Sequence, residues 1–208
     1  MKALTSRIIG GVLMSLLVTA ASLSVAAPIT GVTVSTTFAP PPQFGSALQN
    51  IVNGSGLSSY TTGATNSAGA PSTTWVVGNT VGTITFDLGG VFDLDGMAIW
   101  NFNGNNNFGV KDLTIDGSVD GGSYALISGA PTGFGISSNS SSETAQLFSF
   151  TTTARFVRFN ITSSHGSPGV GLSEVMFTGT AVTVPEPGTL ALLGIALVGL
   201  TAARRRVQ

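Results

Sequence analysis

The sequence predicts an all-β sandwich between two apolar ends. Short segments in which apolar and polar residues alternate recur from Trp75 onward. Gly, Asn or Ser residues separate these segments, and the same region has no convincing helical pattern. Short alternating strands joined by such turns are typical of sandwiches and barrels. We therefore expect about eight short strands around one core.

The alternation of apolar and polar residues locates each strand along the chain. Trp75 and Trp100 lie inside strand segments and are interpreted as core residues. Arg158 lies between aromatic residues, which favours a structural role through stacking. The run Asp93–Gly96 is interpreted as a turn between strands. After a start at Trp75, the predicted strands cover residues 81–88, 97–102, 110–119, 123–127, 143–150, 155–161 and 170–177.

Composition limits the possible functions. The chain has 208 residues, no Cys and only 8% charged residues. Between Pro28 and Thr183, three basic residues stand against eight acidic ones, a net charge of −5 (3 − 8). Such a body lacks the basic face that nucleic acid requires. The absence of Cys excludes disulfides and thiolate metal sites.

The N-terminus has the pattern of a secretory signal peptide. Lys2 and Arg7 form a basic region, and an apolar stretch follows at residues 8–18. Ser24-Val25-Ala26 fits the small-x-small rule of signal peptidase. We expect cleavage after Ala26, and the alternative is an uncleaved membrane helix.

The C-terminus predicts a membrane segment behind an extended linker. Residues 188–203 carry no charge and, as a helix, span about 24 Å, slightly less than a hydrocarbon core. Arg204, Arg205 and Arg206 favour the cytoplasmic side. Pro185 and Pro187 should keep the segment around Glu186 extended and accessible.

This tail resembles a PEP-CTERM sorting signal: Val184-Pro185-Glu186-Pro187, one apolar helix and an Arg cluster. Proteins with this signal are substrates of exosortases, membrane transpeptidases of Gram-negative bacteria that make exopolysaccharide. The resemblance implies an inner-membrane anchor that is removed at or near the motif, which leaves the protein at the cell surface or outside. The alternative is a permanent anchor.

Three stretches in the middle resemble discoidin-like domains of the coagulation-factor type C group. They are TTWVVGNTVGTITFDLGGVFDLDGMAIWNFN at 73–103, ARFVRFNI at 154–161 and GLSEVMFTG at 171–179. The resemblance implies a galactose-binding-like jelly roll. The expected organisation is a signal peptide (1–26), an N-terminal segment (27–44), the discoidin-like domain (45–180), a linker with the motif (181–187), a transmembrane helix (188–203) and a basic cytoplasmic tail (204–208).

The same resemblance implies one structural calcium ion. In the family, this ion lies between the loop before the Trp strand and a Glu in the last strand. Glu174 matches that Glu, and Asn53 and Ser55 are the candidates on the loop. The alternative interpretation of Glu174 is a surface charge near Arg155 or Arg158.

A sugar site needs amides or hydroxyls for the sugar hydroxyls and an aromatic face for the C–H side. The loop NFNGNNNFGVKD supplies Asn103, Asn105 and Phe108, and His165 lies before the last strand. These four residues are the candidate ligand-binding residues. An Asn/Gly loop is also ordinary turn chemistry, and a single loop His is commonly solvated.

No pattern indicates catalysis. His165 is the single His, there is no Gly-x-Ser-x-Gly elbow, and Asp112, Asp116 and Asp120 have the spacing of solvated charges on a strand face. We therefore expect an exported, exosortase-sorted protein, not an enzyme, whose sandwich binds extracellular polysaccharide or cell-surface glycan. The alternative is a structural biofilm or surface protein without a specific small ligand.

Overall fold

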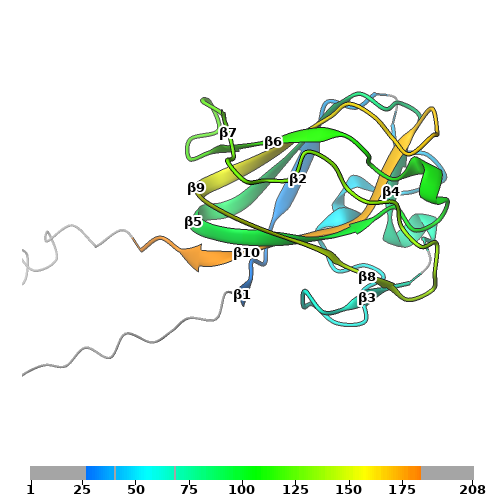
Figure 1. The fold of residues 1–208 in the computed structure, drawn as a ribbon, viewed down its shortest axis with the longest axis horizontal. Helices are drawn as coiled ribbons and strands as arrows, with labels where there is room; N and C mark the ends of the chain where they lie inside the picture. The colour runs from blue at the N-terminus through cyan, green and yellow to red at the C-terminus, as the bar shows by residue number, and fades with distance from the viewer. Residues whose placement is uncertain (1–26, 40, 68, 184–208) are drawn as a thin grey trace, which may run out of the picture.

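The computed structural model describes residues 27–39, 41–67 and 69–183. The predicted signal peptide, the Pro-Glu-Pro motif, the transmembrane helix and the basic tail lie outside the described residues. Within those ranges, no helix is long and apolar enough to cross a membrane. The described chain is an all-β fold, as predicted, with short 3-10 turns between strands (Figure 1).

The strands differ greatly in length. Three are long: β5 (Gly82–Asn101), β9 (Gln146–Ile161) and β10 (Val170–Ala181). The shorter ones are β1 (Ala27–Pro28), β2 (Thr33–Thr36), β3 (Thr65–Asn66), β4 (Trp75–Val77), β6 (Leu113–Ser118), β7 (Ala125–Leu126) and β8 (Glu143–Thr144). The 3-10 turns are η1 (Leu48–Ile51), η2 (Pro71–Thr73) and η3 (Asn106–Phe108).

The long strands organise one antiparallel sheet. Its order is β1-β10-β5-β9-β6-β7, with β2 paired to β5 and β4 paired to β10. The ladder between β5 and β9 shifts register between Asp87 and Phe92 and again between Leu94 and Gly96. Such bulges bend and twist strands, so the sheet curves around the core. Strands β3 and β8 form a separate two-stranded sheet.

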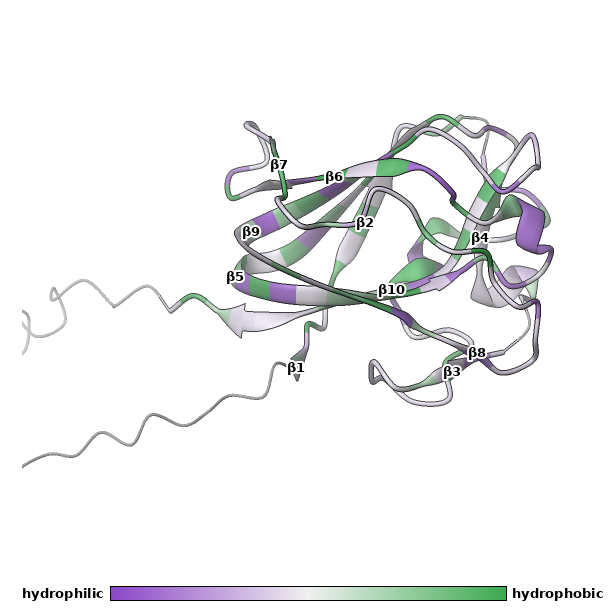
Figure 2. Cartoon of the chain, viewed as in Figure 1, coloured by the Kyte–Doolittle hydropathy of each residue, from purple (hydrophilic) through white to green (hydrophobic). Residues whose placement is uncertain are grey.

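The core lies between the curved layers and is rich in aromatic rings. Phe86 packs edge-on against Phe159 and Phe177, with ring centroids 4.9 Å and 5.2 Å away. Trp75 and Trp100 are buried, which confirms their assignment to the core. Apolar and polar residues alternate along β5 and β9 (Figure 2). This period-two pattern turns one face of each strand inward, and it made the strands detectable in the sequence.

Three predictions about elements need correction. The turn predicted at Asp93–Gly96 is wrong, because these residues lie within β5. The separate strands predicted at 81–88 and 97–102 are one strand interrupted by bulges. Residues 27–44, expected to precede the domain, supply β1 and β2 to the main sheet. In each case, pairing between segments far apart in sequence overrides a local turn or loop signal.

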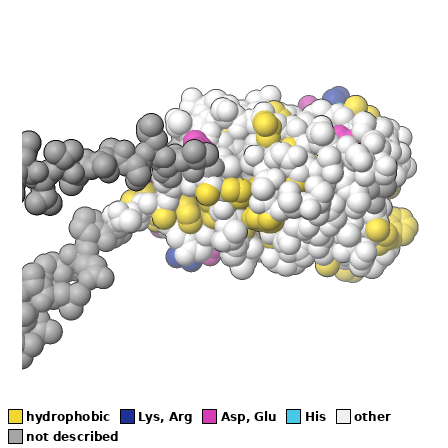
Figure 3. Space-filling model, turned by 90° about the horizontal axis from the view of Figure 1, so that it is seen from below, with side chains coloured by type: hydrophobic (Ala, Val, Ile, Leu, Met, Phe, Trp, Pro, Cys, Tyr) yellow, Lys and Arg dark blue, Asp and Glu magenta, His cyan; other side chains and the backbone are white. Residues whose placement is uncertain are grey.

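The two ends of the described chain lie side by side. Ala27 pairs with Gly179 and Pro28 with Thr178, so β1 and the end of β10 leave the sandwich together (Figure 1). The loops with the 3-10 turns lie at the opposite end of the molecule. The visible surface in Figure 3 is mostly uncharged, with scattered apolar patches and few charged groups.

Candidate functional site

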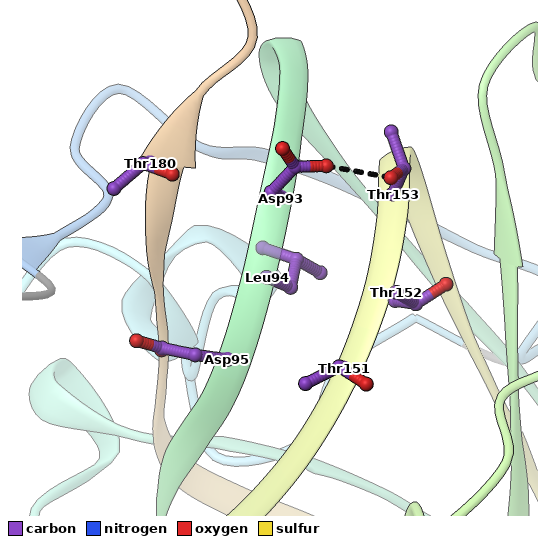
Figure 4. Close-up of a pocket in the computed structure, with 7 residues that line it drawn as sticks. All are labelled: Asp93, Leu94, Asp95, Thr151, Thr152, Thr153 and Thr180. Carbon is purple, nitrogen blue, oxygen red and sulfur yellow. Dashed lines mark hydrogen bonds between the residues drawn. The ribbon is translucent and has the colours of Figure 1, made fainter.

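The hollow in Figure 4 lies on the sheet face, where β5 and β9 are out of register. It has a volume of about 480 Å³ and is lined by Leu94 with Asp and Thr residues. The Asp93 carboxylate accepts a hydrogen bond from the Thr153 hydroxyl at 2.6 Å. Asp95 accepts one from the Thr178 hydroxyl. Because these carboxylates already have partners and no aromatic ring lines the hollow, it offers little to a specific ligand.

A second depression has different chemistry and is called the aromatic cleft here. It has a volume of about 260 Å³ and lies among loops at the end of the sandwich away from β1. Segments distant in sequence build it. The residues that define it are Phe44, Pro71, Val76, Phe102, Asn105 and Phe108.

Phe44 projects from a tight turn. Its side chain is 72% exposed. The φ angles of Phe44 (56°) and Gly45 (74°) are both positive, and the Ser46 N–H donates to the Gln43 carbonyl at 3.0 Å. These are features of a type I′ turn. The turn is anchored to β4, because the Gln43 N–H donates to the Val76 carbonyl at 2.8 Å. A large exposed ring is thus held in place at a costly backbone conformation.

Another part of the cleft lining comes from the loop after β5. Turn η3 places Asn105 and Phe108, and the Asn105 side chain accepts the N–H of Asn107 at 3.3 Å. The Phe108 ring lies 6.0 Å from the ring of Phe102, centroid to centroid. Phe108 is half-buried and Asn105 is exposed. The structure therefore brings two of the four candidate ligand residues together in a cleft that is also lined by Phe44 from another segment.

Two buried amides fix this loop. Nδ2 of Asn101 donates to the carbonyls of Val110 (2.8 Å) and Gly135 (2.9 Å), while its Oδ1 accepts the N–H groups of Val110 and Phe102. Asn103 is only 1% exposed, and its Nδ2 donates to the Ser140 carbonyl at 2.6 Å. Asn103 does not line the cleft. It was a candidate ligand residue, and in the structure it instead braces the loop that carries Asn105.

His165 also lies outside the aromatic cleft. Its Nε2 is 2.9 Å from the carbonyl oxygen of Phe134, and its backbone N–H donates a hydrogen bond to the carbonyl oxygen of Gly109 at 3.0 Å. The ring is half-buried. These bonds tie the loop before β10 to its neighbours. The geometry therefore gives His165 a bracing position rather than a place at the cleft.

Glu174 lies on β10 under the loop that follows η1. It is fully buried, Oε2 accepts the N–H of Gly54 at 3.0 Å, and Oε1 has no protein partner. Desolvation by burial raises the pKa of the Glu174 carboxyl to about 8. The alternative of a surface charge near Arg155 or Arg158 is therefore wrong. A buried carboxyl with an unbonded oxygen is the kind of donor that a bound cation would use.

The loop candidates for the metal are less well placed. Asn53 is exposed, and its Oδ1 accepts the Ser55 N–H at 2.8 Å. Among the residues that the structure describes, no three His, Asp or Glu side chains gather in a metal-binding group. The fit to calcium therefore depends on Glu174, with neutral oxygens as the remaining ligands.

The basic side chains of the described chain all face carboxylates. Arg158 is 2.8 Å from Asp116, and Arg155 is 2.9 Å from Asp87. The third, Lys111, makes a loose surface pair with Asp112 at 4.0 Å. The guanidinium carbon of Arg158 also lies 3.9 Å from the Tyr124 ring centroid, so Arg158 does stack on an aromatic ring, although this ring is not one of its neighbours in sequence. None of these cations lines the aromatic cleft.

Sequence reasoning missed Phe44 and Phe102. Phe44 lies in the segment 27–44, which the sequence places before the domain, and Phe102 looks like an ordinary strand-end residue. The one available signal was the unusual run Phe44-Gly45, in which a bulky residue precedes Gly where type I′ turns prefer Asn. That signal indicates a turn but not its position against the η3 loop.

Two family models match the sequence. The F5/8 type C domain matches residues 50–175, and the PEP-CTERM protein-sorting motif matches residues 183–206. The sorting motif implies an exported protein that an exosortase processes. No curated protein matches the sequence.

Several solved structures share the fold. A family 89 glycoside hydrolase from Clostridium perfringens, in complex with PUGNAc, has a TM-score of 0.53 at 20% identity, over 77% of this chain and 16% of that chain. The present chain thus spans a small part of that enzyme. The module CpGH89CBM32-5 from the same organism, in complex with GalNAc-β-1,3-galactose, has a TM-score of 0.53 at 16% identity, over 73% of this chain and 99% of that chain.

A third similar structure is the family 32 CBM of NanJ from C. perfringens, in complex with galactose. Its TM-score is 0.51 at 13% identity, over 74% of this chain and 99% of that one. At such identities the likeness concerns the fold. The F5/8 type C model, in contrast, covers more than half of the sequence. Together with the sandwich and the sorting motif, this match shows that the chain belongs to the F5/8 type C domain family and carries a PEP-CTERM sorting motif.

Proposed function

We propose that this exported protein binds carbohydrate and that the aromatic cleft is its binding site. The observation that carries the proposal is Phe44, an exposed ring held at positive φ on an anchored turn, which lines the same cleft as Phe108. Residues in strained backbone conformations often serve binding or catalysis. Two of the similar structures are complexes of sugar-binding modules, which supports the same role.

The chemistry of the cleft suits a pyranose ring. A sugar has an apolar C–H face, which packs on an aromatic ring, and hydroxyl groups, which need hydrogen-bond partners. Phe44 and Phe108 offer the rings, and Nδ2 of Asn105 is available to a hydroxyl because its own turn uses Oδ1. The cleft volume of about 260 Å³ lies near the lower end of small-molecule sites. The proposed role is binding without catalysis.

A glycan array with the full chain in detergent tests this proposal. We expect the wild-type protein to bind at least one neutral glycan, and Phe44→Ala and Phe108→Ala to reduce binding at least tenfold. Leu147→Ala is the matched control, because Leu147 is 66% exposed and lies outside the cleft. Failure to bind any glycan, including the producer's own polymer, would favour the alternative of a surface protein without a specific small ligand.

We further propose that the chain reaches its site of action by the route its motif implies. Signal peptidase would release the N-terminus, the C-terminal helix would hold the protein at the inner membrane, and exosortase would remove that helix. The mature protein would then stay at the surface or in the extracellular polysaccharide. The match of the PEP-CTERM model to residues 183–206 supports this route.

One calcium ion at Glu174 is part of the proposal. The buried carboxyl and its unbonded Oε1 support it, and neutral oxygens near Asn53 and Ser55 would complete the ligand set. A bound ion would supply the positive charge that the buried carboxylate lacks and would tie the loop at Gly54 to β10. Its expected role is structural.

A further inference from the structure

The aromatic cleft contains no charged side chain. Its lining is mainly apolar, with the rings of Phe44, Phe102 and Phe108 and the side chains of Pro71 and Val76. Two polar side chains remain. The Thr74 hydroxyl donates to the Ala70 carbonyl at 3.1 Å, and Thr74 is buried. Asn105 is therefore the main side chain that can bond a ligand hydroxyl.

The rest of the described chain does not compensate for this lack of charge. Arg155, Arg158 and Lys111 each face an Asp, and the body has an excess of acidic groups. An anionic sugar in the cleft would lose hydration without gaining a cation. Burial of an unpaired charge is strongly unfavourable, and the surrounding field would oppose the approach of an anion.

A fully hydroxylated sugar is also poorly matched. Each hydroxyl that enters an apolar cleft gives up a hydrogen bond to water and needs a replacement. Asn105 can replace only a few of these bonds. A sugar that carries a methyl group presents apolar surface to the rings instead, so the same burial then favours binding.

We propose that the aromatic cleft selects neutral pyranoses that carry a methyl group and rejects uronic acids and sulfated sugars. The methyl group belongs either to C6 of a 6-deoxyhexose or to an N-acetyl substituent. This inference rests on the proposed carbohydrate-binding function and adds the class of sugar. Phe44 and Phe108 contact the methyl-bearing face, and Asn105 bonds one hydroxyl.

Isothermal titration of the full chain in detergent tests the inference with sugars that differ by one group. The pairs are N-acetylglucosamine and glucose, L-fucose and L-galactose, and galactose and galacturonic acid. A buried methyl group should raise the affinity about fourfold or more. The first two pairs distinguish the two sources of the methyl group. Galacturonic acid should bind at least tenfold more weakly than galactose, and the affinities for neutral sugars should not depend on salt.

Variants make the test specific to the cleft. Phe108→Ala should abolish the preference for the methyl-bearing sugar within each pair. Asn105→Lys should increase binding of galacturonic acid, because it adds a cation at the cleft, whereas Ser123→Lys on an exposed turn should not. Galacturonic acid that binds wild-type protein as tightly as galactose would overturn the inference and leave the proposed function intact. Equal affinities for N-acetylglucosamine and glucose, together with equal affinities for L-fucose and L-galactose, would also overturn the inference and leave the proposed function intact. The absence of binding to any sugar would contradict the proposed function itself.

Discussion

At the scale of single residues, Phe44 shows how stability and binding can oppose each other. A left-handed backbone costs a residue with a Cβ about 1 kcal/mol or more. Phe44 recovers little of this cost by burial, because its ring is 72% exposed. The fold tolerates the residue because the turn is tied to β4. The cost is understandable if the exposed ring serves a ligand.

Replacing Phe44 should therefore change stability and glycan affinity in opposite directions. Asn before Gly is the preferred pair in type I′ turns, so Phe44→Asn should raise the free energy of unfolding by about 1 kcal/mol. The same variant should lose at least tenfold in glycan affinity because the ring is gone. Chemical denaturation and titration calorimetry measure the two effects. Wild-type affinity in Phe44→Asn would show that the ring does not contact the ligand.

Glu174 makes stability depend on pH in metal-free buffer. Burial raises the pKa of its carboxyl from 4.5 to about 8. Between these values the unfolded chain loses a proton that the folded chain keeps, so the free energy of unfolding falls as pH rises. The fall is at most about 1.4 kcal/mol per pH unit. Stability is greatest below the unfolded pKa of 4.5, and the loss is complete above about pH 8.

The isosteric variant Glu174→Gln isolates this effect. It has no proton to release, so its stability should change much less between pH 5 and pH 8. Urea unfolding at several pH values, in buffer with a chelator, measures the difference. Parallel pH profiles for wild type and variant would mean that the carboxyl is ionised in the folded state.

Bound calcium should stabilise the folded protein when Glu174 is ionised. At pH 7.5, millimolar calcium should raise the melting temperature of the wild-type protein by several degrees, because a ligand that binds only the folded state stabilises it. Glu174→Gln should show little shift, and magnesium should act more weakly because it requires a tighter octahedral site. A chelator should reverse the effect. An equal shift in wild type and variant would place any calcium elsewhere.

At the scale of elements, the strands were easier to predict than the loops. Alternation revealed most of β5, β9 and β10, because one face of each strand must be buried. The bulges that join the predicted pieces of β5 leave no such pattern. For this reason the prediction of a turn at Asp93–Gly96 is wrong: these residues lie at a bulge within β5.

The candidate site was predicted only in part, for a physical reason. Asn105 and Phe108 were accessible to sequence reasoning because both lie on one loop. The turn of Phe44 is positioned by hydrogen bonds from Gln43 and Ser46 to Val76 of β4, which is itself paired to β10. The burial of Asn103 depends in the same way on a contact with Ser140. Such contacts between distant segments have no local signature.

Gly171 couples the packing of β4 and β10 to the cleft. A Cβ at this position would lie 2.7 Å from the Trp75 carbonyl oxygen and 2.6 Å from Cδ2 of Phe102. Gly171→Ala should lower the free energy of unfolding by about 1–3 kcal/mol and should weaken glycan binding, because the Phe102 ring must move. Gly122→Ala is the control, since its nearest neighbour would be 3.7 Å away. Wild-type stability in Gly171→Ala would show that β4 and β10 can separate at little cost.

At the scale of the whole molecule, the aromatic cleft and the two ends of the described chain lie at opposite ends of the sandwich. Strands β1 and β10 leave the sandwich together, and the aromatic cleft lies among the loops at the far end (Figure 1). A protein held through its C-terminal segment would thus present the cleft away from the attachment point. The face shown in Figure 3 has few charged groups, so contact with a neutral polymer there would desolvate few charges.

The positions of β1 and β10 also predict what processing leaves behind. Strand β1 begins at Ala27, directly after the expected signal-peptidase site, and β10 ends at Ala181, before the sorting motif at Val184–Pro187. Cuts after Ala26 and at the motif would therefore spare all the sheet residues in the part of the chain that the structure describes. The intact mass of the protein from the producing cell should correspond to residues from Ala27 to the motif, plus any attached group. Glu186→Ala should keep the tail if exosortase reads the motif. A wild-type mass that includes residues 188–203 would indicate a permanent anchor, and a cut within β10 would remove the pairing partners of β1 and show that the body need not stay intact.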